Sequence, residues 1–204
     1  MDVAIIDSGG ANLASLGFAL DRLGARSVVT TDESVIRSAP RVLLPGVGAA
    51  ADAMVRLDEA GLTGVIPTLT QPVLGICLGM QLLFDASTES GDGRATRCLG
   101  IVPGTVDKLP ASIQTPVPHM GWNQRDTRID DPLFDGLDDA AYFYFVHSYA
   151  APVGPATIAT TRYGQEFTVA LRERNFRGVQ FHPERSARSG SRLLENFLRR
   201  VPCN

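Results

Sequence analysis

Residues 72–81 read Pro-Val-Leu-Gly-Ile-Cys-Leu-Gly-Met-Gln, an apolar run that leads into the pattern G-x-C-x-G around Cys77. An apolar run without polar alternation is typical of a strand that is buried on both faces. A nucleophile placed between such a strand and a following helix forms a nucleophile elbow, here with Cys in place of Ser. We therefore expect Cys77 to lie on a tight turn between a strand and a helix in an α/β protein.

The glycines around Cys77 fit this interpretation. A residue on a tight turn needs small neighbours, and Gly75 and Gly79 let the backbone pack closely around it. The turn also places the thiol at the start of a helix, where the partial positive charge favours a thiolate. The backbone amide of Leu78, the residue after the nucleophile, is then the expected first donor to an oxyanion. The competing interpretation is structural, because a free Cys is often a small buried hydrophobe.

Strand-like and helix-like segments alternate through the first half of the chain. Apolar runs predict strands at 2–7, 26–30, 41–44 and 72–76, and helical spacing predicts helices at 12–24, 34–38, 49–60 and 78–86. This alternation is typical of βαβ units and a parallel sheet. The second half predicts strands at 101–109, 142–149, 157–162, 168–174 and 178–181, in an antiparallel or mixed region, and then an amphipathic helix at 191–201. We expect one α/β domain over residues 1–204.

Composition and charge argue against several function classes. The chain has 19 basic and 22 acidic residues, a net charge of −3, which gives no electrostatic reason to expect nucleic acid or a membrane as partner. No apolar stretch approaches the ~18 residues of a spanning helix, and the beginning MDVAIIDSGG lacks the features of a signal peptide. The three cysteines and three histidines have neither metal-ligand spacing nor a disulfide pattern. We expect a cytoplasmic protein without a metal or cofactor.

A second motif, His-Pro-Glu, occupies residues 182–184. Pro183 favours an extended backbone at His182, and residues two apart in an extended segment point to the same side. His182 then suits the role of a base whose ring is oriented by Glu184, as in a nucleophile–base–acid triad. Each residue alone also has a structural explanation, as a core histidine and a surface carboxylate. Their combination with Cys77 is much rarer and favours catalysis.

Residues 75–81 and 180–184 together resemble the paired signatures of the class I glutamine amidotransferases. The resemblance implies an open mixed sheet flanked by helices. It also implies hydrolysis of glutamine through a glutamyl thioester on Cys77, with His182 and Glu184 completing the triad. The ammonia released in this way reaches a second active site.

Further segments resemble one branch of this family, the glutaminase subunits of imidazole glycerol phosphate synthase in histidine biosynthesis. They are Leu-Pro-Gly-Val-Gly at 44–48, His-Met-Gly-Trp-Asn at 119–123, the His-Ser-Tyr that ends 144–149, Asp-Ser-Gly-Gly-Ala-Asn-Leu at 7–13 and Pro-Glu-Arg-Ser at 183–186. The resemblance runs nearly from end to end. The chain departs from the usual pattern at Ser8, Ala11 and Arg185, where the branch usually has Tyr, Gly and Lys.

The resemblance implies roles for these segments. The amides of Val47 and Leu78 are expected to hold the oxyanion, and the glutamine pocket is expected to involve Gly48, Gln81, His147, Ser148 and Tyr149. The implied partner is a cyclase subunit with a (β/α)8 barrel fold, bound in a heterodimer. The cyclase would make imidazole glycerol phosphate and aminoimidazole carboxamide ribotide from its own bound nucleotide. No phosphate-cradling loop occurs in this sequence.

Residues 119–123 lack the periodicity of a helix or strand and combine polar with aromatic side chains, which suits an interface. We expect Trp122 and Asn123 to contact the partner, and Arg185 is a further candidate. His119 is expected to pack or to hydrogen-bond locally. The structural alternative is that the Trp and Met of this segment belong to the core.

Other functions stay open on the sequence alone. Another class I glutaminase, such as the one that serves pyridoxal phosphate synthesis, would share the triad. A Cys hydrolase or peptidase would share only the nucleophile elbow. A non-catalytic binding subunit would need neither the triad nor the elbow. The 119–123 and 147–149 segments favour the histidine pathway, the His-Pro-Glu spacing disfavours a peptidase, and an activity assay separates an enzyme from a binding subunit.

Overall fold

A computed structural model describes residues 1–9, 13–89 and 94–202. Its strands are β1 Val3–Ile6, β2 Ser27–Thr30, β3 Val42–Gly46, β4 Val73–Cys77, β5 Phe84–Ser87, β6 Thr96–Arg97, β7 Val102–Lys108, β8 His119–Gln124, β9 Asp126–Thr127, β10 Tyr142–His147, β11 Tyr149–Ala150, β12 Thr157–Tyr163, β13 Gln165–Glu173 and β14 Phe176–Val179. Its helices are α1 Leu13–Arg22, α2 Glu33–Ser38, α3 Ala50–Glu59, α4 Leu78–Gln81 and α5 Ala187–Arg199. Short 3₁₀ helices span Ile66–Thr68, Pro132–Phe134 and Pro183–Arg185.

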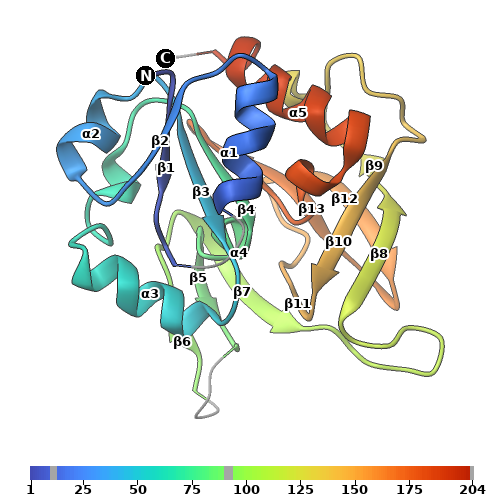
Figure 1. Ribbon diagram of the computed structural model, residues 1–204. Coiled ribbons are helices and arrows are strands. Elements are labelled where there is room, and N and C mark those ends of the chain that lie inside the picture. Colours follow the sequence, from blue (N-terminus) through green and yellow to red (C-terminus); the bar gives the residue numbers. More distant parts are fainter. Residues whose placement is uncertain (10–12, 90–93, 203–204) are drawn as a thin grey trace.

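The main sheet, as far as the chain is described, has eight strands in the order β2-β1-β3-β4-β14-β13-β12-β9 (Figure 1). Neighbouring strands from β2 to β14 pair in parallel, and β13, β12 and β9 continue the sheet with antiparallel pairing. The strands β11-β7-β5-β6 form a second sheet and β10-β8 a third. This arrangement confirms the expected α/β fold with an open mixed sheet.

Helices cover both faces of the parallel part of the sheet. Leu43 and Leu74 of the central strands pack in one apolar cluster with residues of α1 and α5. Val42, Leu44 and Val73, which alternate with them, pack in a second cluster with residues of α2 and α3. Figure 1 shows α1 and α5 side by side over the strands. Because both faces are covered, the carboxyl ends of the strands are the place where a site can open, as in other open α/β sheets.

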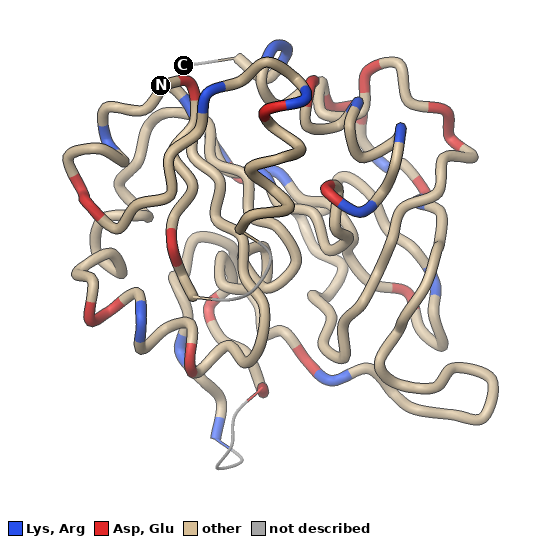
Figure 2. The backbone as a smooth tube through the Cα atoms, in the orientation of Figure 1, with Lys and Arg blue, Asp and Glu red and all other residues tan. Residues whose placement is uncertain are grey.

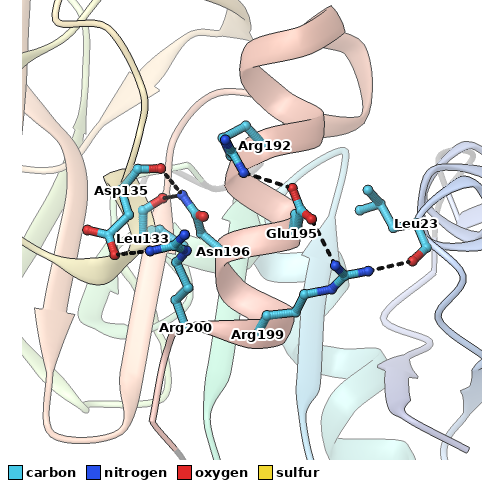
Figure 3. Close-up of polar contacts among 8 residues, drawn as sticks. All are labelled: Leu23, Leu133, Asp135, Arg192, Glu195, Asn196, Arg199 and Arg200. Carbon is cyan, nitrogen blue, oxygen red and sulfur yellow. Dashed lines mark hydrogen bonds and ion pairs between the residues drawn. The ribbon is translucent and has the colours of Figure 1, made fainter.

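Helix α5 follows the His-Pro-Glu segment, and polar contacts fasten its second half (Figure 3). The buried Asn196 donates from Nδ2 to the carbonyl oxygens of Leu133, at 3.1 Å, and Asp135, at 2.8 Å. Arg199 donates to the carbonyl of Leu23, just beyond α1. These contacts join α5 to α1 and to the 132–134 turn, so they hold in place the element that follows the candidate catalytic residues.

Charged residues are interspersed along the chain, without a long run of one sign (Figure 2). Asp131 is a buried carboxylate: its side chain is 0% exposed and accepts hydrogen bonds from Arg177, at 2.9 and 3.1 Å, and from Arg172, at 3.1 Å. A buried carboxylate needs such pairing because its desolvation is costly. These two ion pairs tie the residue before the 132–134 turn to β13 and β14. In the described parts of the chain, no helix is long and apolar enough to cross a membrane.

Two predicted segments differ in the structure. The sequence predicts a helix over 78–86, but α4 ends at Gln81 and residues 84–87 form β5, because Phe84 is buried and pairs with Val102 of β7. Sheet pairing here overrides the local helical spacing. Residues 119–123, expected to be irregular, belong to β8, which pairs with β10 along its whole length.

Candidate active site

Cys77 ends β4 and α4 begins at the next residue, which confirms the predicted strand-to-helix turn. Its backbone has φ 54° and ψ −111°, a conformation that L residues rarely adopt. Such local strain is typical of a nucleophile elbow, where the surrounding packing must hold the turn. The two glycines provide the room: a Cβ on Gly79 would overlap the carbonyl oxygen of Leu44, and one on Gly75 would lie 2.7 Å from the carbonyl oxygen of Gly79.

The structure brings His182 and Glu184 to Cys77. His182 Nδ1 lies 2.8 Å from Glu184 Oε1, and the two side chains are 4% and 3% exposed. Burial by itself lowers the pKa of His182, but the hydrogen bond and charge of Cys77, and then those of Glu184, outweigh burial and raise this pKa to about 10. Because Glu184 occupies Nδ1, Nε2 is the ring atom left for the thiol. The His182 ring is therefore held next to the Cys77 thiol by Glu184, in an arrangement that can accept a proton.

A cavity of about 380 Å³ opens beside the thiol. Its lining includes the sequence-predicted Val47, Gly48, Cys77, Leu78, Gln81, His147, Ser148, Tyr149, His182 and Arg185. These residues meet because Gly46 of β3 pairs with Cys77 of β4, and Val179 of β14 pairs with Ile76. A pocket of this size with a few convergent polar groups suits a small polar ligand. Among the residues that the structure describes, no group of three or more His, Cys, Asp and Glu is placed to hold a metal ion.

Glu89 also lines the cavity, and sequence reasoning missed it. Its Oε2 accepts a hydrogen bond from the amide of Ala50, at 3.2 Å, at the start of α3. Burial raises the pKa of Glu89, the Ala50 amide opposes that effect, and the negative charge of Asp52 adds to it. Glu89 gives the pocket an acidic side chain in addition to the basic Arg185. Its position twelve residues after Cys77 carries no local motif, so nothing in the sequence pattern distinguishes it.

The residues expected at a partner interface do not share one environment. Trp122 is 53% exposed on the outer face of β8, where it packs edge-on against Tyr144 of β10. Asn123 is half-buried on the opposite face and is held locally, because its Oδ1 accepts from the amide of Gln124. Arg185 lies in the cavity lining. The structure thus presents Trp122 outward and uses Asn123 within the chain.

The departures from the usual family pattern can be placed in part. Ser8 is buried, and its Oγ donates to the carbonyl of Pro45 at 2.6 Å, while its own carbonyl accepts from Arg56 Nε at 3.0 Å. Ser8 therefore fixes the end of β3, directly before Val47. Ala11 lies outside the described residues.

Comparison with known proteins agrees with this geometry. Residues 4–201 match the family "Glutamine amidotransferase class-I". The chain is 52% identical over 198 residues to the imidazole glycerol phosphate synthase subunit HisH of Pectobacterium atrosepticum and 50% identical over 198 residues to that of Yersinia pestis. In both cases the match covers 97% of this chain and 99% of the relative.

Solved structures agree on the fold. A crystal structure of a glutamine amidotransferase has a TM-score of 0.69 at 18% identity, covering 97% of each chain. The extent and identity of the sequence matches show the family. The chain belongs to the class I glutamine amidotransferases and, within them, to the HisH subunits of imidazole glycerol phosphate synthase.

Proposed function

We propose that this chain is a cytoplasmic glutaminase that hydrolyses glutamine to glutamate and ammonia and delivers the ammonia to a cyclase partner in histidine biosynthesis. The observation that carries the proposal is that Cys77, on a strained elbow, and His182 line one pocket, while Glu184 is hydrogen-bonded to the His182 ring. The whole of residues 1–204 is proposed to form one glutamine amidotransferase domain.

In the first step, His182 takes the proton of the Cys77 thiol, and the thiolate attacks the amide carbon of glutamine. The raised pKa of His182 favours this transfer, and Glu184 holds the ring in place. The tetrahedral intermediate carries a negative oxygen, which the amides of Val47 and Leu78 are proposed to bind. Losing one such donor costs about 3–4 kcal/mol of transition-state stabilisation in comparable sites.

In the second step, protonated His182 gives its proton to the departing nitrogen and the carbon–nitrogen bond breaks. Ammonia is released, and a glutamyl thioester remains on Cys77. A water molecule, deprotonated by His182, then attacks the thioester carbon and releases glutamate, and the proton returns to the thiol. Protons and charges balance over the cycle, and no cofactor is needed.

Glutamine recognition depends on the two charged groups attached to its α-carbon, the α-ammonium and the α-carboxylate. We propose that Glu89 pairs with the α-ammonium group, because its carboxylate lies in the pocket lining. The backbone around Gly48 and residues 147–149, with Gln81, is proposed to hold the rest of the amino acid.

The partner is proposed to be a (β/α)8 cyclase subunit bound in a heterodimer over the exposed face of β8 and β10. Met120, Trp122 and Tyr142 are 52–62% exposed on this face, and Val146 of the same strand pair lines the pocket. An aromatic surface continuous with the pocket would shield ammonia from bulk water, where it would become ammonium. The cyclase would then form imidazole glycerol phosphate and aminoimidazole carboxamide ribotide.

The test is to trap the thioester. The chain is mixed with glutamine, quenched in acid within its turnover time, and digested, and the Cys77 peptide is examined by mass spectrometry. A glutamyl adduct on Cys77 that is absent from Cys77→Ser is the expected result. Glutamate formation without any adduct in the wild-type protein, also under conditions that slow hydrolysis, would contradict the mechanism.

A further inference from the structure

A buried carboxamide approaches the Cys77 sulfur and has no part in the proposed proton transfers. Gln180 directly follows β14, is 0% exposed, and has its Nε2 3.7 Å from Cys77 Sγ. Its Oε1 lies 2.8 Å from Gln81 Nε2, and that nitrogen also lies 2.9 Å from the carbonyl oxygen of Tyr149. Three residues from distant parts of the sequence thus form one chain of hydrogen bonds that ends at the nucleophile.

The direction of this chain is fixed by the carbonyl of Tyr149. A carbonyl oxygen only accepts, so the Gln81 atom that faces it must be the NH2 group. The second hydrogen of that group points at Gln180, which must therefore present its oxygen to Gln81. The amide nitrogen of Gln180 is then the atom that faces the sulfur. The polarity follows from the network and does not rest on telling amide oxygen from nitrogen.

A neutral histidine also donates to the Tyr149 carbonyl that orients Gln81. His147 Nδ1 lies 2.8 Å from the same Tyr149 carbonyl, so Nδ1 carries the hydrogen. Burial lowers the pKa of His147 to about 3, which keeps the ring neutral near pH 7. Besides Cys77 and His147, the ionisable side chains among the described residues that line the pocket are Glu89, Tyr149, His182 and Arg185. The donor from Gln180 therefore adds a neutral dipole that does not change with pH in the working range.

We infer that Gln180 is a further catalytic residue of this site: its Nε2 donates a hydrogen bond to the Cys77 sulfur and stabilises the thiolate. The inference rests on the proposed glutaminase reaction for its purpose, but the interaction itself is independent of any substrate. A hydrogen bond to the anionic thiolate is stronger than the same hydrogen bond to the neutral thiol. The donor therefore stabilises the reactive form of Cys77 more than the unreactive form. His182 accepts the proton of the Cys77 thiol, and Gln180 donates a hydrogen bond to the sulfur after that proton has left.

The test measures thiolate formation without glutamine. Carboxamidomethylation of Cys77 by iodoacetamide is followed from about pH 5 to 10 by mass spectrometry of the Cys77 peptide, in wild type, Gln180→Met and Gln180→Asn. Met keeps the length of the side chain without the donor, and Asn keeps the carboxamide but is too short. We expect the pH of half-maximal rate to rise by about one unit in both, with alkylation near pH 6 about tenfold slower.

Two controls accompany the variants. Asn196→Leu removes another fully buried carboxamide that also donates to carbonyl oxygens, and its Cys77 profile should match the wild type. Cys98, whose pKa burial raises to about 11, is an internal reference whose slow alkylation should be unchanged in all variants. Circular dichroism selects the Gln180 variants that are folded, and one folded variant is sufficient.

The outcomes separate the two proposals. A folded Gln180 variant whose Cys77 profile lies within about 0.2 pH units of the wild type overturns the role of Gln180. A shifted profile together with a lower kcat and little change in KM for glutamine supports it. If the wild-type protein releases no glutamate at all, the proposed function fails, while the alkylation profile still decides whether Gln180 stabilises the thiolate.

Discussion

The Nδ1 atom of His182 lies 2.8 Å from Oε1 of Glu184, only two residues along the chain, with Pro183 between them. His182 has an extended backbone, and a 3₁₀ helix begins at Pro183. This change of direction brings the Glu184 carboxylate back to the His182 ring, whereas Pro183 and the spacing of the two residues predict one continuous extended segment. The pairing is therefore as predicted, but a tight turn produces it.

Glu184→Gln should lower the pKa of His182. Glu184 favours the charged imidazole, and so does Cys77, whereas burial favours the neutral ring, so removal of one negative charge moves the pKa down from about 10. An NMR titration of the His182 ring nitrogens measures the change. The glutaminase kcat should fall about 10²–10⁴-fold, because the base is weaker and less well oriented.

Cys77→Ala is the companion measurement, since it removes the other group that favours the cation. Its His182 pKa should also fall. A His182 resonance that titrates at the same pH in wild type and in both variants would refute this account of its charge.

Gly79→Ala should destabilise the fold, whereas Gly17→Ala should not. A Cβ on Gly79 would overlap the backbone oxygen of Leu44, and backbone cannot move aside cheaply. We expect a loss of about 1–3 kcal/mol or more in the free energy of unfolding. Gly17 lies inside α1 with nothing within 4 Å of its Cβ direction, so alanine there should stabilise by about 0.5–1 kcal/mol. Urea denaturation compares the two, and equal effects would count against the packed elbow.

Glu89→Gln should raise the KM for glutamine about tenfold or more and leave kcat within a few-fold, because a hydrogen-bonded charge pair with the substrate is lost. Steady-state kinetics measure both constants. Glu59→Gln is the matched control, since Glu59 is exposed on α3, the helix whose first turn Glu89 contacts. An unchanged KM in Glu89→Gln would remove this residue from the binding site.

Trp122→Ala should weaken assembly with the cyclase by about 2 kcal/mol or more, as expected for an exposed aromatic residue near the centre of an interface. Isothermal titration with the purified cyclase measures the affinity. Val55→Ala changes a side chain of similar exposed fraction, 56% against 53%, on α3, which Figure 1 places away from β8. If both variants bind equally well, the face of β8 and β10 is not the docking surface.

The triad could be predicted because its signals are local. Cys77 is marked by the residues immediately around it, and His182 and Glu184 by a tripeptide. The parallel pairing of the first strands also follows from the alternation of strands and helices along the chain, and the structure confirms it.

The rest depends on contacts between distant segments. Gln180 acquires its partners only when β14 pairs with β4, and Glu89 enters the pocket only when it reaches the start of α3. For the same reason, Phe84 leaves the predicted helix, since its burial against β7 decides its conformation.

The most direct measurement is glutamate release from glutamine by the purified chain, alone and with the cyclase and its nucleotide ligand, beside Cys77→Ala. We predict release that increases with the liganded cyclase and falls to the background in the variant. Absence of glutamate from the wild-type protein under every one of these conditions, or undiminished release by Cys77→Ala, would contradict the assignment of Cys77 as the nucleophile of a glutaminase.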